Sequence, residues 1–351
     1  MKTRCEGRPS TSSALLGYPR SRKNGGQSGG FHGAAYGARQ KLRRAESQRA
    51  VEGRERSGVE APREHRSTIL SSLSACRLCP RECGANRLEG ERGFCGAGRL
   101  ARVAAVSVHH GEEPPISGTR GSGTIFFSHC NMKCLFCQNY PISQYGNGRE
   151  MDTETLAGEM LLLQKRGAHN INFVTPTPHA PQMVEAILLA RGSGFDLPVV
   201  YNTNGYDSPE TLALLDGVVD IYLPDAKYRS TELAGAVSGT PDYPSHNEAA
   251  IAGMVRQVGF LSAEEDGIAA RGVLVRHLVL PGKVEETEAV LARLSERCGP
   301  ELPLSLMGQY FPAWRAASTP GFRNKLARKE YDRAIEGAKL LGFRNVFIQE
   351  I

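Results

Sequence analysis

Short apolar runs alternate with longer amphipathic segments from residue 122 to the end of the chain. The apolar runs have the length of strands and lie at 124–128, 171–175, 198–201, 218–223, 272–280 and 302–307. Between them lie segments of helical length, at 152–167, 180–193, 208–216, 247–259 and 285–297. Strands that alternate with helices predict a parallel sheet with right-handed crossovers. Because the runs are apolar along most of their length, we expect both faces of the sheet to be covered.

Two α/β architectures fit this pattern: a closed or partly closed (βα) barrel and an open, doubly wound sheet. Periodicity alone favours neither of them. In both architectures the functional residues gather at the carboxyl ends of the strands. A further strand is predicted at 100–108, and the chain closes with a helix at 329–341 and a short strand at 345–348.

The amino-terminal part of the chain has a different composition. Residues 1–66 are polar and rich in Gly, and they predict a disordered basic extension; a Cys-rich module follows at 67–100, beginning with a helical pattern at 68–75. The (βα) domain then occupies 101–351. A basic, Ser-rich leader with few acids is also typical of an organelle transit peptide. We expect a cytoplasmic protein, or an organellar one if residues 1–50 are such a peptide.

The net charge of +6 comes from the amino-terminal stretch, because residues 1–44 hold ten Lys or Arg against the single acid Glu6. The remainder of the chain is slightly acidic. A nucleic-acid partner therefore loses the support that the overall charge would give it. No apolar run reaches the roughly 18 residues that a membrane-spanning helix needs, so we expect no membrane span.

The densest chemical signal is the loop after the run 124–128, where Cys130, Cys134 and Cys137 are spaced C-x3-C-x2-C. Thiolates are soft ligands that select iron–sulfur clusters, zinc or Cu(I). Three protein ligands leave one metal position open, and an open position is typical of a catalytic site. The alternative is a three-Cys zinc site that takes its fourth ligand from His129 or Cys95.

This spacing, with the aromatic Phe136 before the last cysteine, resembles the radical S-adenosylmethionine (SAM) superfamily. Other stretches resemble the PflX group of pyruvate formate-lyase activating enzyme-like proteins: 111–117, 167–172, 175–178, 201–205, 220–225 and 276–282. The resemblance covers about residues 70–345. It implies a partial (βα)6 barrel and a 4Fe-4S cluster on Cys130, Cys134 and Cys137, with SAM bound to the open iron. In such enzymes the reduced cluster cleaves SAM and yields a 5'-deoxyadenosyl radical.

The resemblance also implies which side chains bind SAM. They are Phe136 at the adenine, Thr175 and Thr177 at the amino group, Asn202 and Asn204 at the ribose or carboxylate, and Asp225 and Lys227 as an Asp-x-Lys pair. Relatives have His directly after Thr-Pro-Thr, whereas this chain inserts Pro178 before His179. Adjacent residues of a strand face opposite ways, so Arg276 and His277 do not both point into the barrel. We predict that Arg276 points inward, where its guanidinium suits a carboxylate.

A second group of cysteines, Cys76, Cys79, Cys83 and Cys95, is spaced C-x2-C-x3-C-x11-C. Four soft ligands predict a closed site, either zinc or an auxiliary 4Fe-4S cluster, with a structural or electron-relay role. The alternative is a set of buried free thiols. Closely spaced cysteines without a secretory signal favour metal ligation in a reducing compartment over disulfides.

We therefore predict a radical SAM enzyme, oxidoreductase-like and similar to the activating enzymes of glycyl-radical enzymes. It would take electrons from a reductant such as flavodoxin or ferredoxin and act on a protein or a small molecule. The alternatives are a non-catalytic iron–sulfur electron-transfer protein and a zinc-binding module for nucleic acid. The large barrel and its polar strand ends argue against the first alternative. The slightly acidic folded part, with the single Trp314, argues against the second.

Overall fold

The computed structural model describes residues 16–17, 69–349 and 351. The predictions made for residues 1–66, a disordered extension or a transit peptide, lie outside the described residues, apart from strand β1 (Leu16–Gly17). The described part of the Cys-rich module begins in a helical turn at 69–71 and continues as loops around a short 3-10 helix, η1 (Arg87–Glu89).

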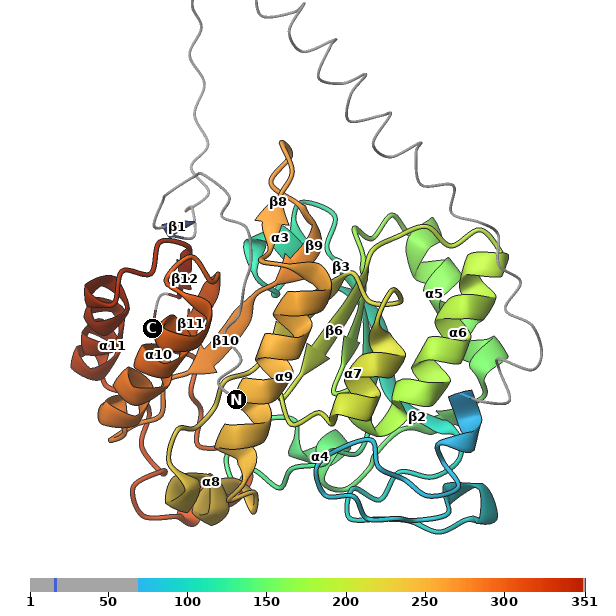
Figure 1. Cartoon of the computed structure of the whole chain (residues 1–351), viewed down its shortest axis with the longest axis horizontal. Coiled ribbons are helices and arrows are strands. Elements are labelled where there is room, and N and C mark those ends of the chain that lie inside the picture. Colours follow the sequence, from blue (N-terminus) through green and yellow to red (C-terminus); the bar gives the residue numbers. More distant parts are fainter. Residues whose placement is uncertain (1–15, 18–68, 350) are drawn as a thin grey trace, which may run out of the picture.

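A curved set of parallel strands forms the centre of the molecule (Figure 1). In spatial order these strands are β3 (Ser122–Phe127), β5 (Ile171–Val174), β6 (Val199–Thr203), β7 (Ile221–Pro224), β10 (Val275–Leu278), β11 (Leu304–Met307) and β12 (Val346–Ile348). Each pairs in parallel with its neighbour, and a parallel bridge between Asp225 and Arg276 joins β7 to β10. The predicted parallel α/β fold is confirmed.

The run at 272–280, which we predicted to be one strand, is two strands. The first, β9 (Ala269–Val273), pairs with β7, whereas β10 pairs with β11. Gly272 has φ 122°, and a Cβ at this position would lie 2.3 Å from the Cα of Leu261. Only glycine therefore fits at this position inside β9, and Leu274 separates β9 from β10. The sequence prediction was wrong at this point because the interruption falls on Leu274, an apolar residue that does not break the apolar pattern.

Antiparallel strands extend the sheet at one edge. β2 (Ala101–His109) pairs with β3, and β4 (Arg149–Met151) pairs with β2. At the other edge β1 pairs with β12, and a two-residue strand, β8 (Ser262–Ala263), lies beside β9. The described strands thus end in β4 on one side and β1 on the other. The architecture is a partly open barrel rather than a closed one.

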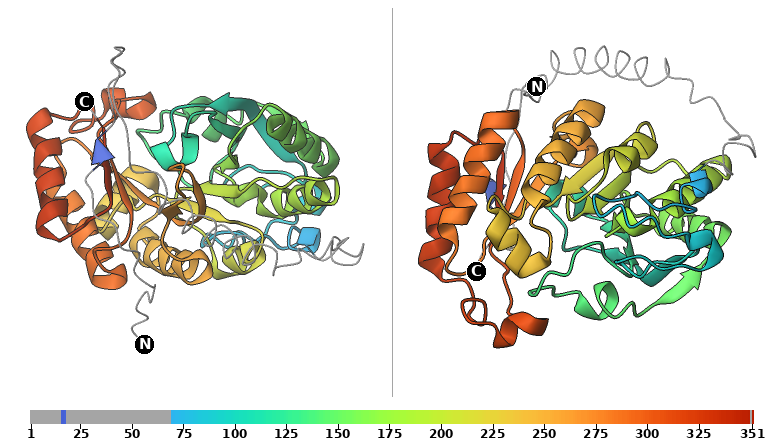
Figure 2. Two further views of the ribbon diagram at one scale, coloured as in Figure 1. Left: turned by 90° about the horizontal axis from the view of Figure 1, so that it is seen from above. Right: turned by 60° about the horizontal axis from the view of Figure 1, so that its bottom comes forward.

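Helices lie on the outer side of the curved sheet (Figure 2). They are α5 (Thr153–Lys165), α6 (Ala180–Gly192), α7 (Pro209–Leu215), α9 (Tyr243–Val258), α10 (Val284–Cys298) and α11 (Arg328–Leu340). Each corresponds to a predicted helix. The pattern did not predict α8 (Thr231–Ser238). The shorter helices α3 (Pro114–Ser117) and α4 (Tyr140–Ser143) were also missed.

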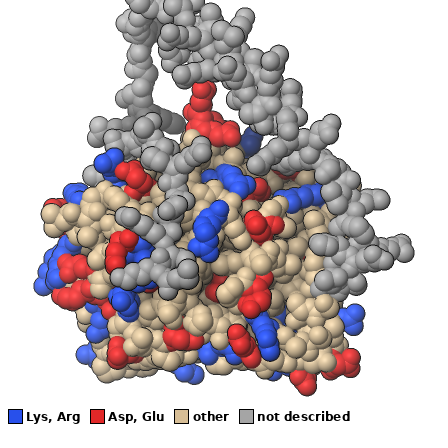
Figure 3. Space-filling model, in the orientation of Figure 1, with Lys and Arg blue, Asp and Glu red and all other residues tan. Residues whose placement is uncertain are grey.

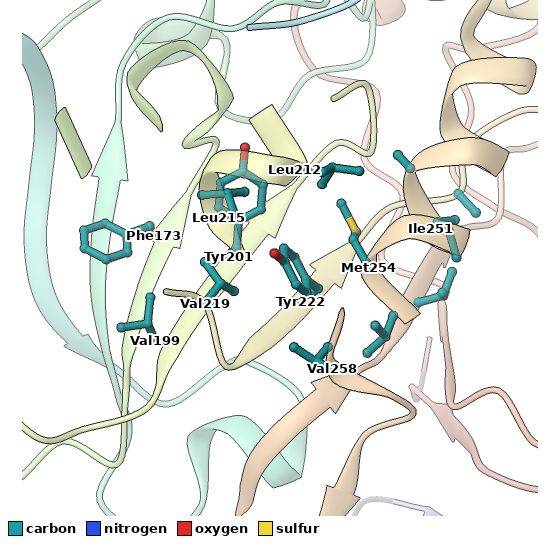
Figure 4. Packing of buried hydrophobic residues seen from close by; sticks show 14 of the residues in the cluster. Phe173, Val199, Tyr201, Leu212, Leu215, Val219, Tyr222, Ile251, Met254 and Val258 are labelled. Carbon is teal, nitrogen blue, oxygen red and sulfur yellow. The ribbon is translucent and has the colours of Figure 1, made fainter. Parts of the chain in front are cut away.

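The main core lies between the strands and the outer helices (Figure 4). Residues that alternate along the strands, such as Phe173, Tyr201 and Tyr222, are fully buried there against helix residues such as Leu215 and Met254. Burial of one large apolar side chain stabilises a fold by about 1.5–3 kcal/mol. This core fixes the strands, so the side chains at their carboxyl ends are held in place.

The carboxyl ends of the parallel strands lie at the lower end of the molecule in Figure 1. The Cys-rich segment, α4 and α8 gather at the same end. Both groups of cysteines therefore lie at the end of the barrel where parallel α/β folds carry their chemistry.

Candidate cluster and cofactor site

The first cysteine loop leaves the sheet directly after β3 and is tied down on several sides. His129, with φ 72°, turns the chain sharply, and its backbone N–H donates to the carbonyl of Ile142 at 3.0 Å. Further along the loop, the N–H of Leu135 donates to the carbonyl of Val237 at 2.8 Å, while its carbonyl accepts from the N–H of Ala316 at 3.0 Å. The loop is therefore fixed by contacts from α8 and from the 3-10 helix η3 (Trp314–Ser318).

All three thiols of this loop have a polar neighbour that can stabilise a thiolate. Cys130 and Cys134 are each 9% exposed. The sulfur contacts are Asn204 Nδ2 at 3.3 Å and Met132 N at 3.4 Å for Cys130, Ser238 Oγ at 2.9 Å for Cys134, and Ser143 Oγ at 3.1 Å for Cys137. Burial, together with the nearby Cys134, raises the pKa of the Cys130 thiol to about 12. Thiolates in this place need a positively charged metal group to balance them.

Asp225, Lys227 and Arg276 form an ion cluster: the first two follow the carboxyl end of β7, and Arg276 is the second residue of β10. One Asp225 oxygen lies 2.6 Å from Lys227 Nζ, and the other lies 3.0 Å from the Arg276 guanidinium. Arg276 also donates to Asn202 Oδ1 at 2.6 Å and lies 3.6 Å from a Glu112 oxygen. Burial works against ionisation of Asp225, but the charges of Lys227 and Arg276 outweigh it and hold its pKa below the usual value.

The alternation predicted for β10 agrees with these contacts. Arg276 faces the interior of the barrel, whereas His277 is buried on the side of α10, where its ring nitrogens contact the Ala226 carbonyl at 2.6 Å and Thr287 Oγ1 at 2.9 Å. Inside the barrel, the Arg276 guanidinium is already paired with Asp225 and lies close to Glu112. Whether it binds the SAM carboxylate stays a prediction.

Thr177 takes part in a buried polar network with Asp207. An Asp207 carboxylate accepts from Thr177 Oγ1 at 2.7 Å, from Tyr201 Oη at 2.8 Å and from Thr203 Oγ1 at 2.7 Å. Thr177 is 1% exposed, so its hydroxyl serves this network. Thr175, with φ 58°, is the partly exposed member of the predicted pair, and it stands next to Asn202 through a backbone hydrogen bond of 2.9 Å.

Asn204 and Phe136 lie beside the cysteine loop. Asn204 Nδ2 donates to Asn131 Oδ1 at 2.7 Å as well as to Cys130. Phe136 is 6% exposed, and its ring centroid lies 6.0 Å from that of Tyr310. The inserted Pro178 leaves His179 fully buried, where it contacts the Ser128 carbonyl at 3.0 Å. His179 therefore supports the end of β3.

Sequence reasoning missed several polar residues that complete the site: Glu112, Asn131, Asp207 and Ser238. Burial raises the pKa of Glu112 to about 7, although the charge of Arg276 opposes this rise. Asn131 directly follows a cysteine and Asp207 follows the Asn-Gly turn, so proximity to motifs was the available signal. Ser238 lies 104 residues from Cys134, and no local pattern connects the two.

The four cysteines of the second group line one pocket, together with Asn131, Thr177 and Pro178. Burial raises the pKa of the Cys79 thiol to about 12, with smaller contributions from Cys95 and Cys76. Within the part of the chain that the structure describes, no three His, Cys, Asp or Glu side chains form a ready-made site for a single ion.

The surface and the helices bear on the alternative readings. On the face shown in Figure 3, Lys and Arg side chains are interspersed with Asp and Glu side chains. Of the helices that the structure describes, none combines the length and the apolar character that crossing a membrane requires.

A partly open (βα) barrel with a three-thiol loop at the end of its first parallel strand defines a class of SAM-dependent iron–sulfur proteins. Residues 124–252 match the radical SAM superfamily. An uncharacterized protein of Methanocaldococcus jannaschii, MJ0674, is 31% identical over 273 residues, which are 75% of this chain and 74% of that protein. The chain belongs to the radical SAM superfamily. Its members are enzymes, and membership implies a 4Fe-4S cluster and SAM as cofactors.

More distant similarities complete the comparison. MJ0808, an uncharacterized protein of the same organism, is 29% identical over 40% of this chain and 46% of its own length. The structure of HydG, a maturase of the [FeFe]-hydrogenase, aligns with TM-score 0.43 and 14% identity over 90% of this chain and 66% of HydG. SuiB of Streptococcus suis bound to its precursor peptide aligns with TM-score 0.41 and 9% identity, and the chain spans 46% of that protein.

The donor set of the loop fits the implied cluster. Three thiolates can hold three irons of a cubane, and the fourth iron then keeps a position free for SAM. Hydrogen bonds from Asn204, Ser238 and Ser143 to the sulfurs are of the kind that tune such clusters.

Proposed function

We propose that the protein is a radical SAM enzyme that cleaves SAM reductively and abstracts a hydrogen atom from its substrate. When bound, the cluster and SAM would supply one-electron cleavage of a carbon–sulfur bond, with methionine and 5'-deoxyadenosine as the final products. The electron would come from a reductant such as flavodoxin or ferredoxin. The observation that carries the proposal is the set of three hydrogen-bonded thiols that follow the carboxyl end of β3, two of them buried and Cys137 partly buried.

The chain's own residues would bind and orient SAM around this loop. Cys130, Cys134 and Cys137 would hold the cluster. Phe136 would pack against the adenine, and Asn204 would hold both the loop and the ribose or carboxylate, since it already donates to Cys130 Sγ at 3.3 Å. Phe136 and the three cysteines stand in one apolar cluster with Tyr310 and Tyr243, which keeps water away from a reactive species.

The test is SAM turnover by the full-length protein. Protein reconstituted with iron and sulfide without oxygen, and then reduced with dithionite, should form 5'-deoxyadenosine and methionine. Cys134→Ala should abolish this product, whereas Gln138→Ala, an exposed position in the same loop, should keep it. Cleavage retained by the Cys134 variant would count against the ligand set. A cluster-loaded wild-type sample without turnover would favour an electron carrier.

We further propose that the substrate is a glycine in a partner protein, as in the glycyl-radical activating enzymes that the sequence resembles. This finer assignment rests on the combined resemblance of the segments 111–117, 167–172, 175–178, 201–205, 220–225 and 276–282. Purified pyruvate formate-lyase is a suitable probe partner. A glycyl radical detected by electron paramagnetic resonance after SAM turnover would support the assignment. Turnover without that radical would exclude this partner.

A further inference from the structure

The cysteines of the amino-terminal module have no part in the proposed reaction, yet they share one pocket at the carboxyl end of the barrel. They are Cys76, Cys79, Cys83 and Cys95. The chain is shaped closely around them: a Cβ on Gly93 would lie 2.3 Å from Cys83 Sγ and 3.2 Å from Cys83 Cβ, so a larger residue here would displace the Cys83 side chain. Backbone hydrogen bonds between Cys76 and residues 84–85 close the loop. The sequence therefore folds these thiols toward a common space.

Arg87 is a buried cation at the wall of this pocket. It is 1% exposed, and its guanidinium donates to the carbonyls of Gly98, at 2.6 and 3.0 Å, and Pro178, at 2.7 Å. Its Nη1 lies 4.0 Å from Cys76 Sγ. Among the described residues, no Asp or Glu pairs with it. A buried charge is costly unless an opposite charge balances it.

The missing negative charge is best supplied by the cysteines themselves. Free thiols are neutral at pH 7 because their ordinary pKa is about 8.5. Thiolates that ligate a metal group carry the charge, and a centre with four of them is an anion. We propose that Cys76, Cys79, Cys83 and Cys95 ligate a second iron–sulfur cluster, and that Arg87 is its buried counter-charge.

The choice of iron–sulfur over zinc follows from where the pocket lies. Asn131 forms part of its wall, and the same residue accepts from Asn204 Nδ2, which also contacts Cys130 Sγ. Arg81 fixes Asn131 from the other side by donating to its carbonyl at 2.6 Å. One asparagine thus separates the two cysteine sets. A closed cluster in this place can pass one electron from an external reductant to the first cluster, whereas zinc is redox-inactive.

The relay role rests on the proposed function, but the presence of the cluster does not. We would therefore remove the first ligand set by the triple substitution Cys130→Ala, Cys134→Ala and Cys137→Ala in the full chain. After anaerobic reconstitution this variant should keep about four iron atoms per chain, against about eight in the wild type. The retained iron should give a paramagnetic signal on reduction that does not change when SAM is added. One zinc per chain without iron, or no metal at all in the folded variant, would overturn the proposal.

Substitution of Arg87 tests whether this residue acts as a counter-charge or only packs. The same experiment tests the proposal if the triple variant does not fold. Arg87→Gln should shift the reduction potential of the second cluster to lower values, because loss of a nearby positive charge favours the oxidised form. Arg87→Lys keeps the charge and should restore most of the potential. An unchanged potential in Arg87→Gln would contradict the counter-charge assignment.

The relay is tested with the double variant Cys83→Ala and Cys95→Ala. Its flavodoxin-driven formation of 5'-deoxyadenosine should fall at least tenfold, while the dithionite-driven reaction continues, because a small reductant can reach the first cluster directly. An equal rate with both reductants would refute the relay. If the wild type also makes no 5'-deoxyadenosine while the triple variant keeps its iron, the proposed function fails and the second cluster stands.

Discussion

Asp225→Asn is the sharpest single test of the charges in the candidate site. The substitution keeps the shape of the side chain but removes the negative charge that lies 2.6 Å from Lys227 and 3.0 Å from Arg276. These three side chains are only 13–15% exposed, so water can do little to solvate the positive charges that lose their partner. Removal of one partner from a buried ion pair costs about 3–5 kcal/mol. For a domain of this size, that cost corresponds to roughly 6–20 °C in melting temperature.

The assay is thermal unfolding of the full chain, compared with the wild type and with a control. Glu288→Gln is the matched control because Glu288 pairs with Arg333 at 2.7 Å on the exposed surface, where loss of the pair should cost at most about 1 kcal/mol. Binding of SAM should be measured on the same samples. A melting temperature for Asp225→Asn as close to the wild type as that of the control would refute the reasoning.

The pH dependence of this difference has a definite sign. The pKa of Asp225 is lowered in the folded state, so its stabilising effect is present above its unfolded pKa and is lost as the pH falls through the folded value. Because the charge of Asp225 also helps to raise the pKa of Glu112, the comparison is made in a Glu112→Gln background, where the effect of Asp225→Asn should be constant from pH 5 to pH 8 and shrink only in stronger acid. A difference that changed steadily across neutral pH would point to another group.

Two further substitutions test other parts of the structure. Glu112→Gln should melt like the wild type near pH 5 and at a higher temperature than the wild type above pH 7. Burial raises the pKa of Glu112 from 4.5 to about 7. The wild type therefore loses up to about 3 kcal/mol of its free energy of unfolding as the pH rises through this window. An equal difference in melting temperature between variant and wild type at pH 5 and at pH 8 would contradict this cause. Gly272→Ala should destabilise the protein by more than about 1 kcal/mol, because φ is 122° and the added Cβ would lie 2.3 Å from the Leu261 backbone. Gly158→Ala, in the open middle of α5, should be neutral or stabilising in the same denaturant titration.

Local periodicity predicted most of the fold because the strands and helices each repeat their own apolar spacing. The regular units from β3 to β12 follow one another in space as they do in sequence, so few long-range choices were left open. The interruption between β9 and β10 escaped prediction because it falls on Leu274, which continues the apolar pattern. Whether the barrel closed depended on the register and twist of the sheet, which periodicity does not encode.

The cysteine sets could be found from spacing alone, since metal ligands must lie close together on a loop. Their surroundings could not. Ser238 reaches Cys134 only because α8 packs beneath the loop, and Arg87 reaches Pro178 across 91 residues of sequence. Thr177 was predicted from its motif, but the structure gives its hydroxyl a partner, Asp207, that the motif does not name. Such partners arise from packing between elements far apart along the chain.

The ion cluster lies where the strand beside β7 changes from β9 to β10. Stability and SAM binding must therefore be measured together. β9 pairs with β7 at Gly272 and Val273, and beyond Leu274 a bridge between Asp225 and Arg276 joins β10 to β7, where the N–H of Ala226 donates to the Arg276 carbonyl at 2.7 Å. The backbone bridge and the ion pair thus join the same two residues. If the charges serve only to bind a ligand, the contact between β7 and β10 is stable without them. Asp225→Asn then weakens SAM binding and leaves the melting temperature unchanged. If the charges also stabilise the contact between β7 and β10, SAM affinity and melting temperature fall together. The loss of stability then persists in the protein without SAM.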